Sequence, residues 1–413
     1  MVTDQGDWIS TFLTTYFVCL PDEIVIEILN NVTFDHLVNF FMHFPDYNIQ
    51  QLTRENYSNE VHFVNRPTVT KSYGRSGYKH RFLEFHGKEA IFRFMDEFPD
   101  LVPKRIILFN EFGNFEPIRD IMETYPDRIG QVKEMKISLE KCEITIADFQ
   151  CLTSFPNLTK LNFLRMDLNL IRSVLVNNSE FAQHPKLDEI TFWQHGIYDW
   201  SNVWFPRTLK SLDLSWNNMI DISTLSIPGT VRRVCLNYSN LDSFKVLKTK
   251  IPDTLTELGL VGNQFETLAL NQLPTELRFL DLSSNKISSV VGSNWPKELT
   301  ELRISGNKLD NEALEYINDI IGWPQSITNL DISLNQFTLL ENLSKLPKSL
   351  QVLDISKNSL IWNDPQLINF HFPDHLTKLN LSDCEIDSVR YFRFPSSLEK
   401  LILKSNEEDI GSW

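Results

Sequence analysis

One spacing rule recurs along the second half of this 413-residue chain and constrains its fold more than any other feature. In LPTELRFLDLSSNKI, aliphatic residues follow Pro274 at positions +3, +6 and +8, and Asn285 follows at +11. The same frame follows eight further prolines: Pro206, Pro228, Pro252, Pro296, Pro324, Pro347, Pro373 and Pro395. Two copies replace the asparagine, with Ser239 and Cys384. Nine copies in one frame, mostly 22 to 24 residues apart, predict a stacked repeat protein.

The frame resembles the leucine-rich repeat, L-x-x-L-x-L-x-x-N-x-L, over roughly residues 103–413. The resemblance implies an α/β solenoid, with parallel strands on the concave face and a mostly irregular or short helical convex side. The leucines of each short strand would point inward, and the asparagine amides would bond adjacent turns in a ladder. Each proline would precede its strand, where its missing N–H removes no bond between strands.

Upstream of residue 201 the frame loosens. After Pro156 and Pro185 the first aliphatic residue follows at +2, not +3. KRIILF (104–109) and KEMKISL (133–139) predict strands, whereas 88–98 and 114–125 predict amphipathic helices between them. We therefore expect helix-backed repeats over 86–200 and short proline-led repeats over 201–413. The segment 61–85 contains a stretch rich in Gly, Ser and basic residues, which predicts a linker or loop.

The segment LPDEIVIEIL (20–29) also begins with Leu-Pro but does not fit the frame. Counted from Pro21, Glu27 takes the aliphatic position +6 and Val32 takes the asparagine position +11, so a strand would bury a charge. A helix places the aliphatic residues on one face and Glu27 on the other. Residues 1–60 are therefore expected to form a small all-helical module.

This segment and the apolar stretch that follows it resemble the F-box. The matching positions are Leu20, Pro21, Ile24, Ile28, Leu29, Leu37 and Val38. The resemblance implies that these side chains dock on a Skp-family adaptor, which links to a cullin–RING ubiquitin ligase. The chain departs from the family where a Cys/Ser-x-x-Trp signature usually follows: it has HFPDYNIQQL (43–52), in which Pro45 breaks the helical run.

A ligand of the solenoid should meet the concave strand positions +5, +7 and +9. Most of them carry the recurring Asp and Ser of the repeat, and an Asp row of this kind is a property of the stacked strands, not a metal site. The exceptions are residue types that anchor protein interfaces: Lys160, Trp193, Arg233, Phe279 and Arg303. Arg233 and Arg303 are expected to receive an acidic or phosphorylated peptide of a protein substrate.

Composition narrows the class of partner and the compartment. The formal charge of −15 disfavours nucleic acid and anionic membrane surfaces. Five scattered cysteines argue against a disulfide framework and for a reducing compartment, the cytoplasm and/or the nucleus. No apolar run approaches the length of a membrane span. No motif of a nucleophile, a phosphate loop or a metal site is present, so we expect no catalytic residue, metal or cofactor.

These observations give one leading expectation and one alternative. The leading one is a substrate-recognition subunit of a Skp–cullin–F-box ubiquitin ligase, whose solenoid binds a protein substrate while partner subunits perform the chemistry. The alternative is a scaffold outside any ligase, in which the N-terminal helices only cap the apolar end of the solenoid.

Overall fold

The computed structural model describes most of the chain after residue 102 and short stretches before it. The described residues are 60–65, 83–85, 88–97, 99, 102–110, 115–139, 145–153, 155–164, 172, 175–176, 178–193, 199–218, 222–361, 370–386, 389 and 392–406. The chain divides into two compact units, which we treat separately. Unit 1 is Met1–Val174 with Gln183–Leu187, and unit 2 is Leu175–Ala182 with Asp188–Trp413. The expected F-box-like positions lie outside the described residues.

The described part of unit 1 is a parallel sheet with helices. Its strands stand in the order β2-β1-β3-β4-β5. They are β1 (Glu60–Asn65), β2 (Leu83–Phe85), β3 (Arg105–Asn110), β4 (Glu134–Leu139) and β5 (Lys160–Leu164). The helices are α5 (Lys88–Glu97), α6 (Glu116–Thr124), α7 (Pro126–Ile129) and α8 (Ile146–Thr153). The helices expected over 88–98 and 114–125 and the strands at 104–109 and 133–139 are confirmed.

The segment 61–85, expected as a linker, begins and ends in strands of the sheet. Strand β1 pairs in parallel with β3 over six residues and with β2 over three. The sequence of β1, EVHFVN, alternates Val and Phe with polar residues, which is typical of a strand. The turn-forming residues in the middle of 61–85 concealed the strands at its two ends.

Unit 2 is a longer stack of short parallel strands. Their order is β6-β7-β8-β9-β11-β13-β14-β15-β16-β17. The strands are β6 (Glu189–Trp193), β7 (Ser211–Asp213), β8 (Arg233–Cys235), β9 (Glu257–Gly259), β11 (Phe279–Asp281), β13 (Glu301–Arg303), β14 (Asn329–Asp331), β15 (Val352–Asp354), β16 (Lys378–Asn380) and β17 (Lys400–Ile402). A second, two-stranded parallel sheet joins β10 (Thr267–Ala269) and β12 (Ser289–Val291).

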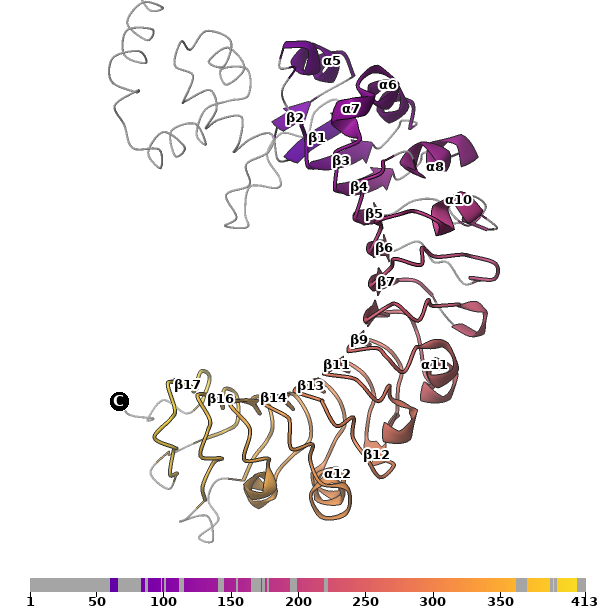
Figure 1. Ribbon diagram of the computed structural model, residues 1–413. Coiled ribbons are helices and arrows are strands. Elements are labelled where there is room, and N and C mark those ends of the chain that lie inside the picture. Colours follow the sequence, from indigo (N-terminus) through magenta and orange to yellow (C-terminus); the bar gives the residue numbers. More distant parts are fainter. Residues whose placement is uncertain are drawn as a thin grey trace, which may run out of the picture. The chain divides into compact units, whose positions relative to one another are not determined.

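Short helical segments return the chain of unit 2 from one strand to the next. They are α10 (Ser179–Ala182), η2 (Ile222–Thr224), α11 (Phe244–Lys250), η3 (Leu270–Gln272), α12 (Asn311–Tyr316), η4 (Ile317–Ile321) and η5 (Leu340–Lys345). The strands of unit 2 line the inner side of its curve, and α11 and α12 lie on the outer side (Figure 1). The extra residues after Pro296 form α12 and η4.

The core of unit 2 follows from the alternation within each strand. The middle residue of a strand, such as Leu212, Leu258 or Leu302, is buried, and its two neighbours face the concave surface. Each framing proline starts a tight turn; in one example the Leu209 N–H donates to the Pro206 carbonyl at 3.1 Å. No repeat covers its own leucines, so burial depends on stacking.

The asparagine ladder predicted from the sequence is present. Asn307 Nδ2 donates to the carbonyls of Leu282 and Ile304, both at 3.0 Å, and its Oδ1 accepts the Ile287 N–H at 2.9 Å. Related bonds are made by Asn217, Asn263, Asn285, Asn335, Asn358 and Asn406. Ser239 and Cys384 keep part of the pattern, because their side chains also point to backbone carbonyls.

The residue before each ladder position, +10 in the proline frame, adopts a left-handed backbone. All nine such residues have φ between 51° and 68°: Trp216, Tyr238, Gly262, Ser284, Gly306, Leu334, Lys357, Asp383 and Ser405. Only two of the nine are glycine, although a left-handed residue with a side chain costs about 1–2 kcal/mol. The repeat therefore imposes this conformation whatever residue stands there.

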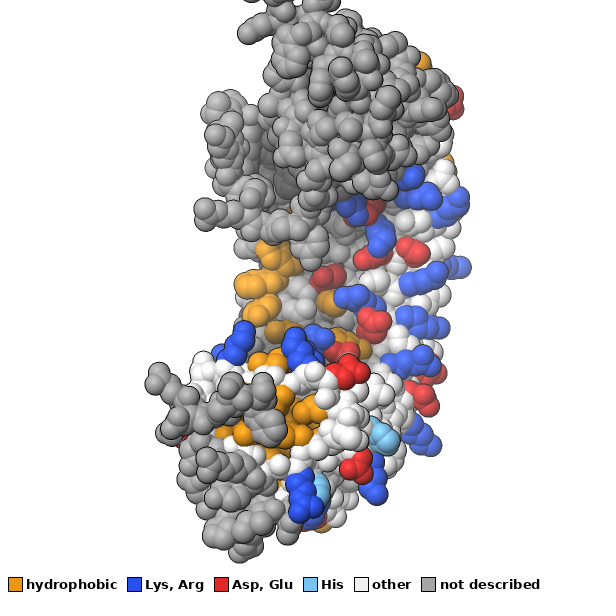
Figure 2. Space-filling model, turned by 90° about the vertical axis from the view of Figure 1, so that its left-hand side faces the viewer, with side chains coloured by type: hydrophobic (Ala, Val, Ile, Leu, Met, Phe, Trp, Pro, Cys, Tyr) orange, Lys and Arg blue, Asp and Glu red, His pale blue; other side chains and the backbone are white. Residues whose placement is uncertain are grey.

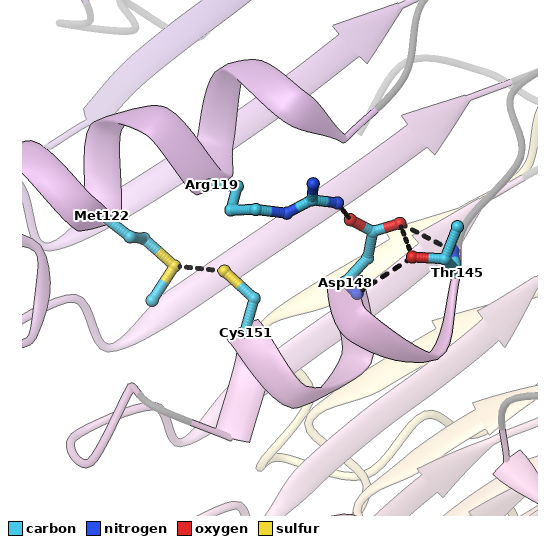
Figure 3. A network of polar contacts seen from close by, with 5 residues as sticks. All are labelled: Arg119, Met122, Thr145, Asp148 and Cys151. Carbon is cyan, nitrogen blue, oxygen red and sulfur yellow. Dashed lines mark hydrogen bonds and ion pairs between the residues drawn. The ribbon is translucent and has the colours of Figure 1, made fainter.

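A buried carboxylate in unit 1 joins two of its helices. Asp148 of α8 accepts hydrogen bonds from the Thr145 N–H at 2.6 Å and the Thr145 hydroxyl at 2.8 Å, and its own N–H donates back to that hydroxyl. Arg119 reaches from α6 to the same carboxylate, and Cys151 lies against Met122 between the same helices (Figure 3). This is a helix-capping arrangement with a charged partner, and we assign it a structural role.

Candidate functional site

One concavity of unit 2 lies where strands β8, β9, β11 and β13 begin. It has a volume of about 510 Å³. Its walls come from positions +4 and +5 of successive repeats: Arg233, Thr256, Glu257, Arg278, Phe279, Thr300 and Glu301. We call it the concave pocket. It exists because four successive repeats carry long side chains where the neighbouring strands carry Ser211 or Asn329.

Arg303 lies beside the concave pocket and orders one side of it. Its guanidinium is 2.5 Å from Glu301 Oε1 and 4.0 Å from Asp281 Oδ2. The Arg303 Cζ also lies 5.3 Å from the ring centroid of Phe279, which is a cation–π contact. An apolar ring, a cation and two carboxylates therefore meet on the two adjacent strands β11 and β13.

Arg233 occupies the opposite side of the pocket and is also close to a carboxylate. Its Nε lies 3.6 Å from Glu257 Oε2, and both side chains are about half exposed. Exposed ion pairs of this kind contribute only about 0–1 kcal/mol, so an incoming charged group can exchange with either partner. An acidic ligand would have to compete with Glu257 for Arg233 and with Glu301 for Arg303.

The acidic residues at position +7 have a structural explanation. Oδ1 of Asp281, Asp331 and Asp354 each accepts the N–H of the serine two residues later at 3.0 Å. Burial raises the pKa of Asp331, the Ser333 hydrogen bonds oppose that rise, and the carboxylates of Asp354 and Asp281 add to it. The recurring Asp-x-Ser thus holds the strand end. Across the part of the chain that the structure describes, no group of three or more His, Cys, Asp or Glu side chains is placed to hold a metal ion.

A second surface feature lies at the carboxyl ends of β6, β7 and β8. Trp193, Trp216 and Tyr238 come from successive repeats, and we call them the aromatic strip. The rings of Trp216 and Tyr238 stack with centroids 4.3 Å apart and planes 22° apart, and Trp193 meets Trp216 edge to face at 6.0 Å. Figure 2 shows apolar side chains gathered at one margin of the concave side, next to charged ones.

The sequence-predicted substrate residues divide among these places. Arg233, Phe279 and Arg303 come together around the concave pocket, and Trp193 belongs to the aromatic strip. Lys160 is exposed on β5 of unit 1 and remains a separate candidate. The adaptor-binding candidates lie outside the described residues.

Sequence reasoning missed Trp216 and Tyr238 because position +10 was not counted as part of the concave surface. The available signal was an aromatic residue at the same frame position in two consecutive repeats, followed by Gly262 in the next. Glu257 and Glu301 were passed over as ordinary strand positions, although they complete the charge of the pocket.

Part of the chain also matches the model of a known protein family. A family model described as "Leucine Rich repeat" matches residues 205–221, 298–317 and 374–389. Three of the proline-led units, those of Pro206, Pro296 and Pro373, match the leucine-rich repeat. Two of the matched stretches begin in the turn just before strands β7 and β13, and the third covers β16, so the family's pattern falls on the observed strands.

Among curated proteins, osteomodulin from Bos taurus is 25% identical over 288 residues. The match covers 69% of this chain and 54% of osteomodulin, so the chain spans about half the length of this leucine-rich-repeat relative. No helix in the described ranges is both long enough and apolar enough to cross a membrane.

The comparison with solved structures gives matches that include the following three. YopM from Yersinia enterocolitica has a TM-score of 0.42 at 16% identity, covering 74% of this chain and 70% of YopM. An internalin from Listeria monocytogenes has a TM-score of 0.42 at 17% identity, covering 70% and 83% of the two chains. A chain of the Drosophila Toll–Spatzle complex has a TM-score of 0.47 at 17% identity, covering 77% and 50%.

Proposed function

We propose that this chain is a protein-recognition receptor whose concave leucine-rich-repeat surface binds a protein partner at the concave pocket. The observation that carries the proposal is the convergence of Phe279, Arg303 and Glu301 on the two adjacent strands β11 and β13, beside a hollow of about 510 Å³. Aromatic and arginine side chains are the residues that most often dominate protein interfaces. The mixed charges of the pocket would bind a partner segment that carries positive and negative charges beside an apolar group.

Within this class, we propose a substrate-recognition subunit of a Skp–cullin–F-box ubiquitin ligase, in the cytoplasm and/or the nucleus. The support is the F-box-like pattern of LPDEIVIEIL together with a leucine-rich-repeat solenoid that follows it. The scattered cysteines favour the same compartments, and Cys151, Cys235 and Cys384 form no disulfide among the described residues. The partner subunits would supply the catalysis.

The adaptor experiment tests the ligase proposal. The full chain is co-purified with a Skp-family adaptor, alongside the triple variant Leu20→Ala/Pro21→Ala/Ile24→Ala. We expect the wild type to retain the adaptor and the variant to retain at least tenfold less of it. If the two bind equally, or if neither binds, the N-terminal segment is a cap and the chain is a scaffold outside the ligase.

The receptor proposal has its own test on the concave surface. Proteins retained by the wild-type chain are compared with those retained by Phe279→Ser/Arg303→Glu and by Ile320→Ser. Ile320 is 70% exposed on η4, away from the concave pocket, and serves as the matched surface control. A partner lost only by the concave variant supports the proposal. Partners that all three chains retain, or that both variants lose, contradict it.

A further inference from the structure

We propose that the aromatic strip binds a proline-rich segment of the protein partner, held in the polyproline II conformation and carrying a basic residue beside the prolines. The inference rests on the proposed receptor function and specifies the chemistry of the partner. It concerns the carboxyl ends of β6, β7 and β8, a different part of the concave side from the pocket at the strand beginnings.

The repeat does not require aromatic residues in the strip. Trp216 and Tyr238 stand at the left-handed position +10, where other repeats carry Gly262, Ser284 or Gly306. Their side chains are 45% and 43% exposed, so the chain leaves two large apolar groups in water on a backbone unfavourable to them. Two large exposed rings side by side, at a position that other repeats fill with Gly or Ser, point to a ligand.

The strip is also pre-organised. A Cβ added at Gly262 would lie 2.3 Å from Tyr238 Cδ1 and Cε1 and 3.0 Å from Cγ, so the ring covers this glycine with its face. Trp216, from the preceding repeat, stacks on Tyr238 at 4.3 Å. Because both faces of Tyr238 are occupied, its rim is the part left for a partner.

Ring rims select a particular kind of ligand. The rim of an aromatic ring is electropositive, and Trp and Tyr add an N–H and an O–H donor there. Backbone carbonyls and flat apolar rings are complementary to such a surface. A polyproline II segment offers both, because its carbonyls make no internal hydrogen bonds and its prolines are already fixed in conformation. Binding of a cation over the ring face is disfavoured at Tyr238, where both faces are packed.

The spacing of the repeats matches the period of this conformation. Neighbouring parallel strands stand about 4.8 Å apart, so Trp193 and Tyr238, two repeats apart, are separated along the stack by roughly 9.6 Å. Polyproline II advances about 3.1 Å per residue, or about 9.3 Å per three-residue turn. A segment lying across the strands can therefore present equivalent side chains to Trp193 and Tyr238.

The charge of the concave surface indicates that the proline-rich segment carries a basic residue. At the outward positions +5 and +7, strands β6 to β15 carry seven acidic residues against two arginines, Arg233 and Arg303, both already beside carboxylates. The acidic residues are Glu189, Asp213, Glu257, Asp281, Glu301, Asp331 and Asp354. Asp213 stands in the same repeat as Trp216, three residues before it. A lysine or arginine next to the prolines would meet this negative field.

Peptide binding to the full chain tests the inference. The probe is a fluorescein-labelled peptide of nine prolines flanked by arginines, measured by fluorescence polarisation. The comparison peptides replace the prolines with glycine and serine, or the arginines with glutamate. We expect each replacement to weaken binding at least tenfold. The inference is overturned if the wild type binds none of the peptides, or binds the glycine–serine peptide equally well.

Substitutions in the aromatic strip distinguish its role in binding from any effect on folding. Trp216→Gly and Tyr238→Ser introduce residues that other repeats carry at position +10, so the fold is retained, and each should weaken binding of the proline probe at least tenfold. The matched control is Leu334→Gly, at the same position and φ but outside the strip, which should bind as wild type does. Equal affinity of Trp216→Gly and wild type contradicts the inference. The receptor proposal survives that result if Phe279→Ser/Arg303→Glu still loses the protein partner.

Discussion

The ring of Tyr238 covers Gly262 so closely that any side chain on the glycine would enter it: a Cβ there would lie 2.3 Å from two ring carbons. The two residues belong to consecutive repeats and both occupy the left-handed position, Tyr238 with φ 51° and Gly262 with φ 68°. Residue choice is thus coupled between these two repeats: the Tyr238 ring, as it lies, leaves room only for glycine at position 262.

This coupling predicts unequal effects of one substitution at two equivalent glycines. Gly306→Ala meets its nearest atom at 3.4 Å, so it should cost only the backbone penalty of about 1–2 kcal/mol. Gly262→Ala should cost a further 1–3 kcal/mol or so, since it also displaces the Tyr238 ring. Urea unfolding of the two variants measures the difference. In a Tyr238→Ser background the extra cost should vanish, and its persistence would show that the ring is not its cause.

The asparagine ladder predicts a strong dependence on the side-chain amide. Asn307→Ala leaves two buried carbonyls and the Ile287 N–H without their side-chain partner, so we expect the free energy of unfolding to fall by at least about 2 kcal/mol. Asn307→Ser should lose less, because Ser239 fills the same position in its own repeat. The control is Asn294→Ala, at an exposed bond to Ser293, which should change stability by under about 0.5 kcal/mol. Similar losses for Asn307→Ala and Asn294→Ala would contradict a role for the ladder.

His184 predicts a loss of stability in mild acid. Its Nδ1 accepts the N–H groups of Lys186 at 3.3 Å and Leu187 at 3.1 Å, so Nε2 carries the proton toward the Phe155 carbonyl at 3.1 Å. Burial lowers the pKa of His184, with the Phe155 hydrogen bond opposing it. The unfolded chain therefore binds a proton first, and the contribution of His184 is full above pH 6.5 and declines as the pH falls below it.

Unfolding free energies at pH 7.5 and 5.5 check the histidine prediction. The decrease between the two pH values should be smaller in His184→Asn than in the wild type. His371 is exposed, so His371→Asn should preserve the wild-type decrease. If His184→Asn retains that decrease in full, another group governs the acid sensitivity.

Two cysteines should react slowly in the folded chain. Burial raises the pKa of the Cys151 thiol and of the Cys384 thiol to about 11. At pH 8 the thiolate fraction is then roughly a hundredfold below that of a thiol with a pKa near 9. Iodoacetamide labelling, located by peptide mass spectrometry, should be slow in buffer and fast in urea. Equal rates in the two solvents would show that neither thiol is protected.

The strand positions and the ladder could be predicted from the sequence because both depend on local spacing. A leucine every two or three residues and an asparagine at +11 have one solution, in which repeats stack and amides bridge them. The strands β1 and β2 could not be found this way. Each pairs with a strand distant in sequence, and the residues between them favour turns.

The candidate sites were only partly predictable, for a different reason. Arg233, Phe279 and Arg303 were found because they interrupt a regular pattern at counted positions. Trp216 and Tyr238 escaped because their backbone is left-handed, and no residue type at position +10 signals this: the nine examples include Trp, Leu, Lys and Ser. The fold, not the local sequence, sets that angle.

The ladder bonds have a direction. Asn406 accepts the N–H groups of Cys384 and Ile386 and donates to the Leu381 carbonyl, all in the repeat before it. Asn263 likewise accepts the N–H groups of Ser239 and Leu241 and donates to the Leu236 carbonyl. Where the ladder residue is asparagine, it thus completes the hydrogen bonds of the repeat before it. Removing repeats from the C-terminal side therefore takes these bonds away from the repeat that becomes last. Removing repeats from the N-terminal side leaves the new first repeat with the bonds from its successor.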